Sequence, residues 1–146
     1  MKTFAVLLLA LAALPAGAQS PAASDLAARA AREPGAAVLP SGLVYRATAE
    51  GAGASPSATD TVRVHYRGVL ADGKEFDSSI KRGQPAEFPL NRVIRCWTEG
   101  VQKMKPGGKA TLTCPPALAY GERGAGGVIP PNATLQFEIE LLGVIR

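Results

Sequence analysis

The sequence predicts an α+β fold, in which a twisted antiparallel β-sheet wraps around one short α-helix. Three observations predict this fold. Several short segments alternate between apolar and polar residues, which is typical of strands with one buried face. Glycine and proline separate these segments, and Asp72-Gly73 is a strong hairpin signal. The segment 93–108 instead has apolar residues at helical spacing and ends in proline and glycine.

The first 18 residues have the features of a secretory signal peptide. They contain a lysine, a short apolar run and the small-residue ending Ala-Gly-Ala. We expect cleavage after Ala18, and therefore a periplasmic or secreted protein without stable membrane insertion. The alternative is an uncleaved anchor, but the apolar run is shorter than the roughly 20 residues that a membrane-spanning helix needs.

Residues 19–40 are rich in alanine, serine and proline. Ser24 could cap a short helix, which Pro34-Gly35 would end. Because the apolar face of this helix would be almost all alanine, we expect a flexible tether with at most a weak helix. A dimerising helix is the alternative, but the segment lacks the leucine or isoleucine seam of a coiled coil. Residues 41–146 then form a single domain.

The strands are predicted from alternation. Residues 43–48 form a short strand, and 61–70 alternate strictly before the hairpin returns the chain into 74–79. Near the end of the chain, residues 109–114 and 135–142 alternate in the same way. The residues expected to face the core from these strands are Val62, Val64, Tyr66, Ala110, Leu112, Cys114, Leu135, Phe137, Ile139 and Leu141.

The predicted helix follows residue 93. Trp97, Val101 and Met104 are spaced i, i+4 and i+7, so they lie on one helical face, and Pro106 ends the helix. This apolar face is expected to pack against the concave face of the sheet.

Composition excludes several kinds of function. Without Lys2 the chain has 15 basic and 12 acidic residues, and the basic residues are scattered, so nucleic-acid binding has little support. In an exported protein, Cys96 and Cys114 are a candidate disulfide, with two buried free thiols as the alternative. Two cysteines and one histidine are too few for a closed zinc site, so we expect no metal.

Two further motifs suggest chemistry that their context opposes. His65, Asp77 and Ser78 or Ser79 are the residue types of a hydrolase triad. Strand alternation places His65 on the polar face with two arginines, where it is most simply solvated, and there is no G-x-S-x-G elbow. The glycine-rich segment 121–127 does not open a helix and has no Walker lysine, so we expect it to rim a pocket.

Five motifs occur along the chain in a fixed order, namely Y-x-G, F-D-S-S, W-x-E-G, A-Y-G and I-P-P-N-A-T-L. Together they resemble the FKBP-type peptidyl-prolyl cis-trans isomerases, from about Gly42 to Ile145. The tether and the start S-G-L-V-Y-R resemble the exported bacterial branch. The resemblance implies a monomeric enzyme without cofactor that acts on proline-containing segments of folding exported proteins and binds macrolide inhibitors. A non-catalytic peptide-binding or holdase chaperone that uses the same pocket is the alternative.

The resemblance also implies the site residues. The catalytic set would be Tyr66, Phe76, Asp77, Trp97, Tyr120 and Phe137, and the substrate-binding set Arg82, Phe88, Val93, Ile94, Val128 and Ile129. In the family, the tryptophan forms the floor under the proline ring and the aspartate pairs with an arginine, here Arg82. The Ile129 N–H would bind a substrate carbonyl, and the Tyr120 hydroxyl would donate a second hydrogen bond.

The chain departs from the family pattern at three single positions and in the step from Leu90 to Val93, which is shorter than in the eukaryotic cytosolic members. Ala86 and Ala125 stand where many members carry larger groups, and Cys96 stands where a glycine usually precedes the tryptophan. A bridge from Cys96 to Cys114 would close a loop of roughly 18 residues and stabilise the fold by about 3 kcal/mol.

Overall fold

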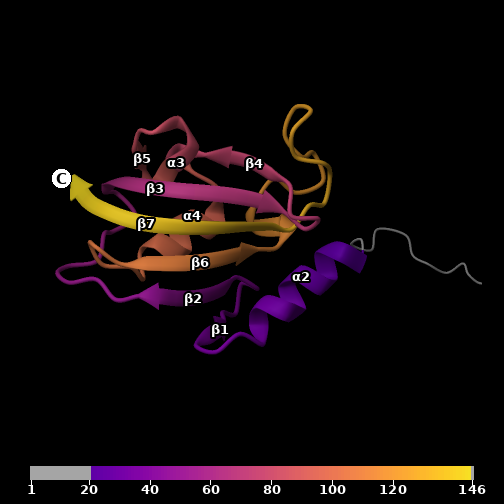
Figure 1. Ribbon diagram of the computed structural model, residues 1–146, viewed down its shortest axis with the longest axis horizontal. Helices are drawn as coiled ribbons and strands as arrows, with labels where there is room; N and C mark the ends of the chain where they lie inside the picture. The colour runs from indigo at the N-terminus through magenta and orange to yellow at the C-terminus, as the bar shows by residue number, and fades with distance from the viewer. Residues whose placement is uncertain (1–20, 146) are drawn as a thin grey trace, which may run out of the picture.

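The computed structural model describes residues 21–145 (Figure 1). The predicted signal peptide and its cleavage site lie outside these described residues. Within them, no helix combines the length and the hydrophobicity that a membrane span requires.

The described residues form one seven-stranded antiparallel sheet with the order β1-β2-β6-β7-β3-β4, and β5 also pairs with β3 (Figure 1). Strand β3 pairs along its whole length with β7, so β4 and β5 share its other edge. The predicted α+β sheet is confirmed. The strands are β1 Ala36–Val38, β2 Val44–Ala49, β3 Thr61–Leu70, β4 Glu75–Ser78, β5 Ala86–Pro89, β6 Lys109–Cys114 and β7 Leu135–Ile145.

The core lies between the sheet and helix α4, Arg95–Val101. The inward residues predicted from alternation on β3, β6 and β7 are all buried, as are Trp97, Val101 and Met104 on the helical side. Gly100 lets the helix lie close to β6, because a Cβ atom there would lie only 3.0 Å from Cγ of Leu112. The shorter elements are α3 Ser79–Arg82 and the 3-10 turns η2 Leu90–Arg92 and η3 Pro116–Leu118.

The stretch predicted as a flexible tether contains regular structure in its described part. Helix α2, Pro21–Ala31, lies on the outer face of the sheet, opposite α4, and β1 pairs with β2 (Figure 1). Leu26 and Ala30, one helical turn apart, are both buried there, and Thr113 of β6 is buried on the same face. In its described part, this stretch therefore lies against the sheet through two apolar contacts and the backbone pairing of β1 with β2.

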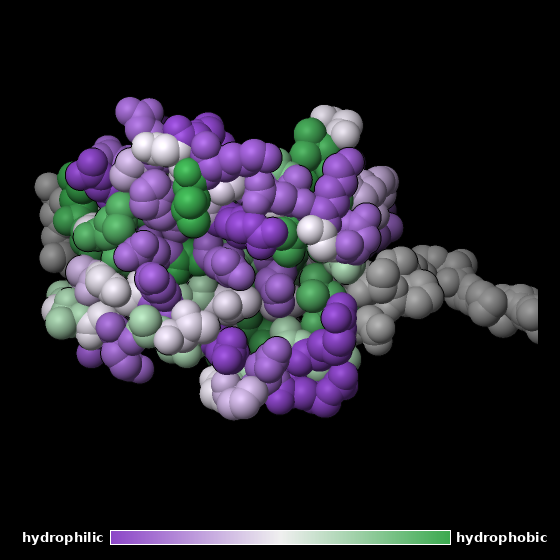
Figure 2. Space-filling model, viewed as in Figure 1, coloured by the Kyte–Doolittle hydropathy of each residue, from purple (hydrophilic) through white to green (hydrophobic). Residues whose placement is uncertain are grey.

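Away from α2, the outer face of the sheet is polar. Figure 2, seen from the same side as Figure 1, shows mostly hydrophilic residues there, with apolar residues scattered among them. Ion pairs lie on this face, including Arg67 with Glu75 at 2.7 Å. The outer face of β3 therefore has the polar character predicted for it.

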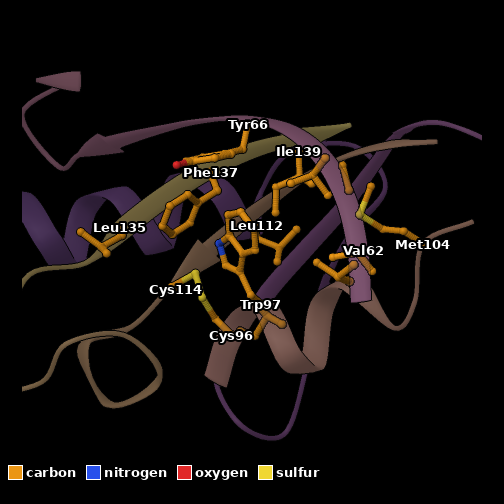
Figure 3. Packing of buried hydrophobic residues seen from close by; sticks show 14 of the residues in the cluster. Val62, Tyr66, Cys96, Trp97, Met104, Leu112, Cys114, Leu135, Phe137 and Ile139 are labelled. Carbon is orange, nitrogen blue, oxygen red and sulfur yellow. A yellow bond between two sulfur atoms is a disulfide. The ribbon is translucent and has the colours of Figure 1, made fainter. Parts of the chain in front are cut away.

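A disulfide links Cys96, in the first turn of α4, to Cys114 at the end of β6 (Figure 3). The two Cα atoms are 5.8 Å apart, and both side chains are fully buried. Because Trp97 is the next residue, the covalent link fixes the backbone beside this side chain to the sheet.

Candidate active site

A pocket of about 460 Å³ opens between the sheet and the start of α4. This volume lies in the range of typical small-ligand clefts. Residues from β3, β4, β5, β7, η2 and α4 contribute to its wall, which is mostly aromatic. The lining residues are Tyr66, Phe76, Asp77, Phe88, Arg92, Val93, Ile94, Trp97, Tyr120 and Phe137.

Trp97 is at the centre of the aromatic wall. Its ring meets those of Tyr66 and Phe137 edge to face, with centroids 5.2 and 5.4 Å away (Figure 3). It meets the ring of Phe88 in the same way, at 5.4 Å. These perpendicular contacts are the favoured geometry for aromatic pairs. The indole N–H is buried and has no hydrogen-bond partner among the described residues. A buried donor without an acceptor usually costs about 1–3 kcal/mol, so the surroundings of this ring are not optimised for stability alone.

Gly68 on β3 makes room for two further rings of the wall. A Cβ atom at this position would lie 2.6 Å from Cζ of Phe76 and 2.9 Å from Cε1 of Phe137. The two phenylalanine rings pack edge to face at 5.6 Å. This residue is the glycine of the Y-x-G motif, for which the sequence alone predicts no role. The role is to bring both rings directly over the strand.

The polar corner of the pocket is a closed triangle of hydrogen bonds. The Tyr66 hydroxyl donates to Oδ2 of Asp77 at 2.5 Å, and Nη1 of Arg82 donates to Oδ1 at 2.5 Å. Nη2 of Arg82 donates to the Tyr66 hydroxyl oxygen at 3.1 Å. Arg82 itself is not part of the pocket wall, but it holds Asp77, as the resemblance implied.

This triangle sets the protonation of its members. Burial alone would raise the pKa of the Asp77 carboxyl, but hydrogen bonds from Tyr66 and Arg82, together with the Arg82 charge, hold that pKa below its usual value. Burial and the hydrogen bond to Asp77 raise the pKa of the Tyr66 hydroxyl. At neutral pH, Asp77 is therefore an anion whose charge Arg82 compensates, and Tyr66 is a neutral donor.

His65 is bonded rather than simply solvated, which corrects the expectation for this residue. Its Nδ1 lies 3.0 Å from Oγ of Ser79. The Ser79 side chain is fully buried and accepts the Tyr66 backbone N–H at 2.7 Å, whereas Ser78 caps α3 through the Lys81 N–H. Because Asp77 is held by Tyr66 and Arg82 and Ser79 is inaccessible, these residues form no hydrolase triad.

Besides Arg82, two more of the expected substrate-binding residues, Val128 and Ile129, lie outside the pocket wall. Val128 is exposed and Ile129 is buried. The Ile129 N–H, expected to bind a substrate carbonyl, donates instead to the carbonyl oxygen of Ala125 at 2.9 Å. The expectation was wrong because the segment 125–129 folds into a turn that uses this donor internally.

One lining residue was missed. Arg92, the last residue of η2, contributes to the pocket wall next to Val93 and Ile94. Its position in the sequence could have indicated this, because Arg92 directly precedes Val93 and Ile94, which were both expected in the pocket. Among the described residues, no group of three or more His, Cys, Asp or Glu side chains could hold a metal ion.

A mostly aromatic pocket with one charge-compensated corner is typical of proteins that bind a ligand with an apolar group. The family follows from comparison with known proteins. Residues 53–142 match the family model of the FKBP-type peptidyl-prolyl cis-trans isomerases. The chain belongs to this family.

Relatives in bacteria agree with this assignment. The chain is 55% identical over 104 residues to a probable FKBP-type peptidyl-prolyl cis-trans isomerase of Haemophilus influenzae, covering 71% of this chain and 43% of that protein. Among solved structures, FkpA from Escherichia coli matches with a TM-score of 0.81 and 48% identity, over 84% of this chain and 57% of that one.

A second solved structure is matched over its full length. This is a peptidyl-prolyl cis-trans isomerase from Pseudomonas syringae, with a TM-score of 0.78 and 38% identity, and the match covers 89% of this chain and 100% of that one. The chain spans about half the length of the curated relatives it matches.

Proposed function

We propose that the protein is a peptidyl-prolyl cis-trans isomerase that accelerates rotation about Xaa-Pro bonds in exported proteins. The observation that carries the proposal is the aromatic pocket centred on Trp97 in a chain of the FKBP family. Proline-containing segments of folding proteins would be its substrates.

The chemistry requires no nucleophile. Rotation about the bond crosses a barrier of about 18–20 kcal/mol, because the twisted amide loses its resonance. The twisted amide also loses much of its dipole, so water stabilises it less than the planar amide. An apolar pocket removes this advantage of the planar form, and tighter binding of the twisted state lowers the barrier. The ring of Trp97 would support the proline ring.

Two donors would hold the carbonyl groups of the substrate. Ile94 lines the pocket just before α4, and its N–H donates to no acceptor within residues 21–145. We propose this N–H as the donor to a substrate carbonyl. The Tyr120 hydroxyl would be the second donor, because Tyr120 lines the pocket and is 40% exposed.

The cellular setting is proposed from two independent features. Residues 1–18 have the pattern of a cleavable signal peptide, and the Cys96–Cys114 disulfide fits an oxidising compartment. Uncatalysed proline isomerisation takes about 10–100 s at 25 °C, so an enzyme in the periplasm or outside the cell would speed the slow folding step of its clients.

The test is cis–trans interconversion of an Ala-Leu-Pro-Phe peptide, measured with residues 19–146 in a chymotrypsin-coupled assay. The chain should accelerate it, and Trp97→Leu should lower kcat/KM at least about tenfold, equal to 1.4 kcal/mol of transition-state stabilisation. Tyr120→Phe removes one hydroxyl from an exposed side chain and should lower kcat/KM about three- to tenfold. His65→Ala is the matched control and should stay within about twofold, because it has no place in the mechanism.

If the folded wild-type chain does not accelerate cis–trans interconversion of the peptide, the proposed isomerase activity is excluded. Peptide binding without acceleration would instead favour the non-catalytic chaperone. Loss of all activity in His65→Ala would revive a role for the histidine and contradict the mechanism.

A further inference from the structure

The pocket wall carries a charge without a counter-ion. Arg92 lines the pocket and is exposed. Within residues 21–145 its guanidinium has neither an ion pair nor a hydrogen bond to another side chain. It is thus available to an incoming ligand.

The rest of the wall does not balance this charge. Asp77 is the other charged lining residue, and both of its oxygens are already bonded, to Tyr66 and Arg82. Asp77 and Arg82 compensate each other. The uncompensated charge of the pocket is therefore positive. It belongs to Arg92 of η2, and Asp77 is the only acidic residue of the described pocket wall.

We propose that Arg92 makes the pocket select Xaa-Pro segments that carry an acidic side chain next to the proline. This inference rests on the proposed function and names its preferred substrate. The proline ring would occupy the aromatic part of the pocket. The side chains of the neighbouring peptide residues would then lie at the rim of the pocket, near the exposed Arg92. A glutamate there gains an ion pair, whereas a lysine meets a like charge.

The size of the effect follows from exposure. Pairs of exposed charges contribute modestly, so the preference for Glu over Lys in kcat/KM should be about three- to tenfold at low salt. Raising the ionic strength from 0.1 to 1 M shortens the screening length from about 10 to about 3 Å, so most of the preference should disappear.

The experiment compares peptides that have Glu, Leu or Lys directly before the proline, and a second set with the same residues directly after it. Two-dimensional exchange NMR reads their cis–trans interconversion without a protease. The wild-type chain should prefer Glu over Lys at one or both positions. Arg92→Gln should bring that ratio close to one, and Arg92→Glu should reverse it.

Arg95→Gln is the matched control. Arg95 is also exposed and lies three residues from Arg92, but it is not part of the pocket wall. Arg92→Gln and Arg95→Gln each remove one positive charge from the chain. Arg95→Gln should keep the wild-type ratio. A ratio near one for the wild type at both positions overturns the proposal, as does an equal effect of the two glutamine variants, which would assign the preference to overall charge.

Failure of the proposed function gives a different result. If the chain accelerates no peptide, including the Leu-Pro peptides, the isomerase proposal fails by itself. The same peptides are then titrated against the fluorescence of Trp97, the only tryptophan. A Glu-over-Lys ratio in Kd that Arg92→Gln removes would support the selectivity, and a ratio of one would overturn it.

Discussion

Reduction of the Cys96–Cys114 disulfide should lower the free energy of unfolding by about 3 kcal/mol. The two cysteines are 18 residues apart in sequence. Opening a loop of this length returns conformational entropy to the unfolded chain, which amounts to about 3 kcal/mol at 25 °C in the chain-entropy description. The folded state changes less, because both sulfur atoms lie in a buried cluster that the reduced thiols can still fill.

Urea unfolding followed by Trp97 fluorescence measures this difference. For a domain of this size, m is about 1–3 kcal/mol/M, so the midpoint of the reduced protein should fall by about 1–3 M. The variant Cys96→Ala/Cys114→Ala, which cannot form the bond, should unfold near the reduced wild type. Coincident midpoints of oxidised and reduced protein would refute the reasoning, as would two free thiols titrated in the unreduced, denatured chain.

Two further predictions concern the pocket. The pKa of Asp77 is lower in the folded state, so the unfolded chain binds a proton more readily. The contribution of Asp77 to stability is therefore present above a pH of about 3.9, the usual pKa of an aspartate, and is lost as the pH falls through the lower folded pKa. Urea midpoints measured from pH 7 to pH 2 should therefore fall more steeply below pH 4 for the wild type than for Asp77→Asn, and parallel curves would contradict the assignment. Gly68→Ala should destabilise the fold by about 1–3 kcal/mol and weaken peptide turnover, because the new methyl group displaces the rings of Phe76 and Phe137. Gly126→Ala, where added atoms meet open space, is the control and should change the midpoint little, and equal effects of the two substitutions would exclude the steric explanation.

The alternation of apolar and polar residues predicted the sheet well where one face of a strand is buried and the other is exposed to solvent. Val62, Val64 and Tyr66 alternate with polar residues, and this contrast fixes both the strand and its inward face. Helix α2 lacks such a contrast, because alanine has almost the same character on either face. Its position on the outer face depends on contacts of α2 with β6, which is distant in sequence.

The aromatic part of the site could be predicted from the family motifs, since ring types and their order along the chain carry that information. Hydrogen-bond partners could not. Whether the Ile129 N–H is available to a substrate depends on the turn 125–129, in which this N–H donates to the carbonyl oxygen of Ala125. The bond of His65 to Ser79 likewise requires the register of β3 against β4 and the position of α3, neither of which a local pattern specifies.

The position of β7 also determines when the molecule can assemble. This strand comes after the six others in the chain but lies at the centre of the sheet, between β6 and β3. Until residues 135–145 pair, the half with β1, β2 and β6 and the half with β3, β4 and β5 each present an unpaired edge. Such long-range pairing is slow, and open edges invite aggregation. Because Phe137 is carried by β7, the pocket cannot be complete before β7 has paired with β6 and β3, so a protein proposed to assist the folding of others depends on a long-range step of its own folding to form its site.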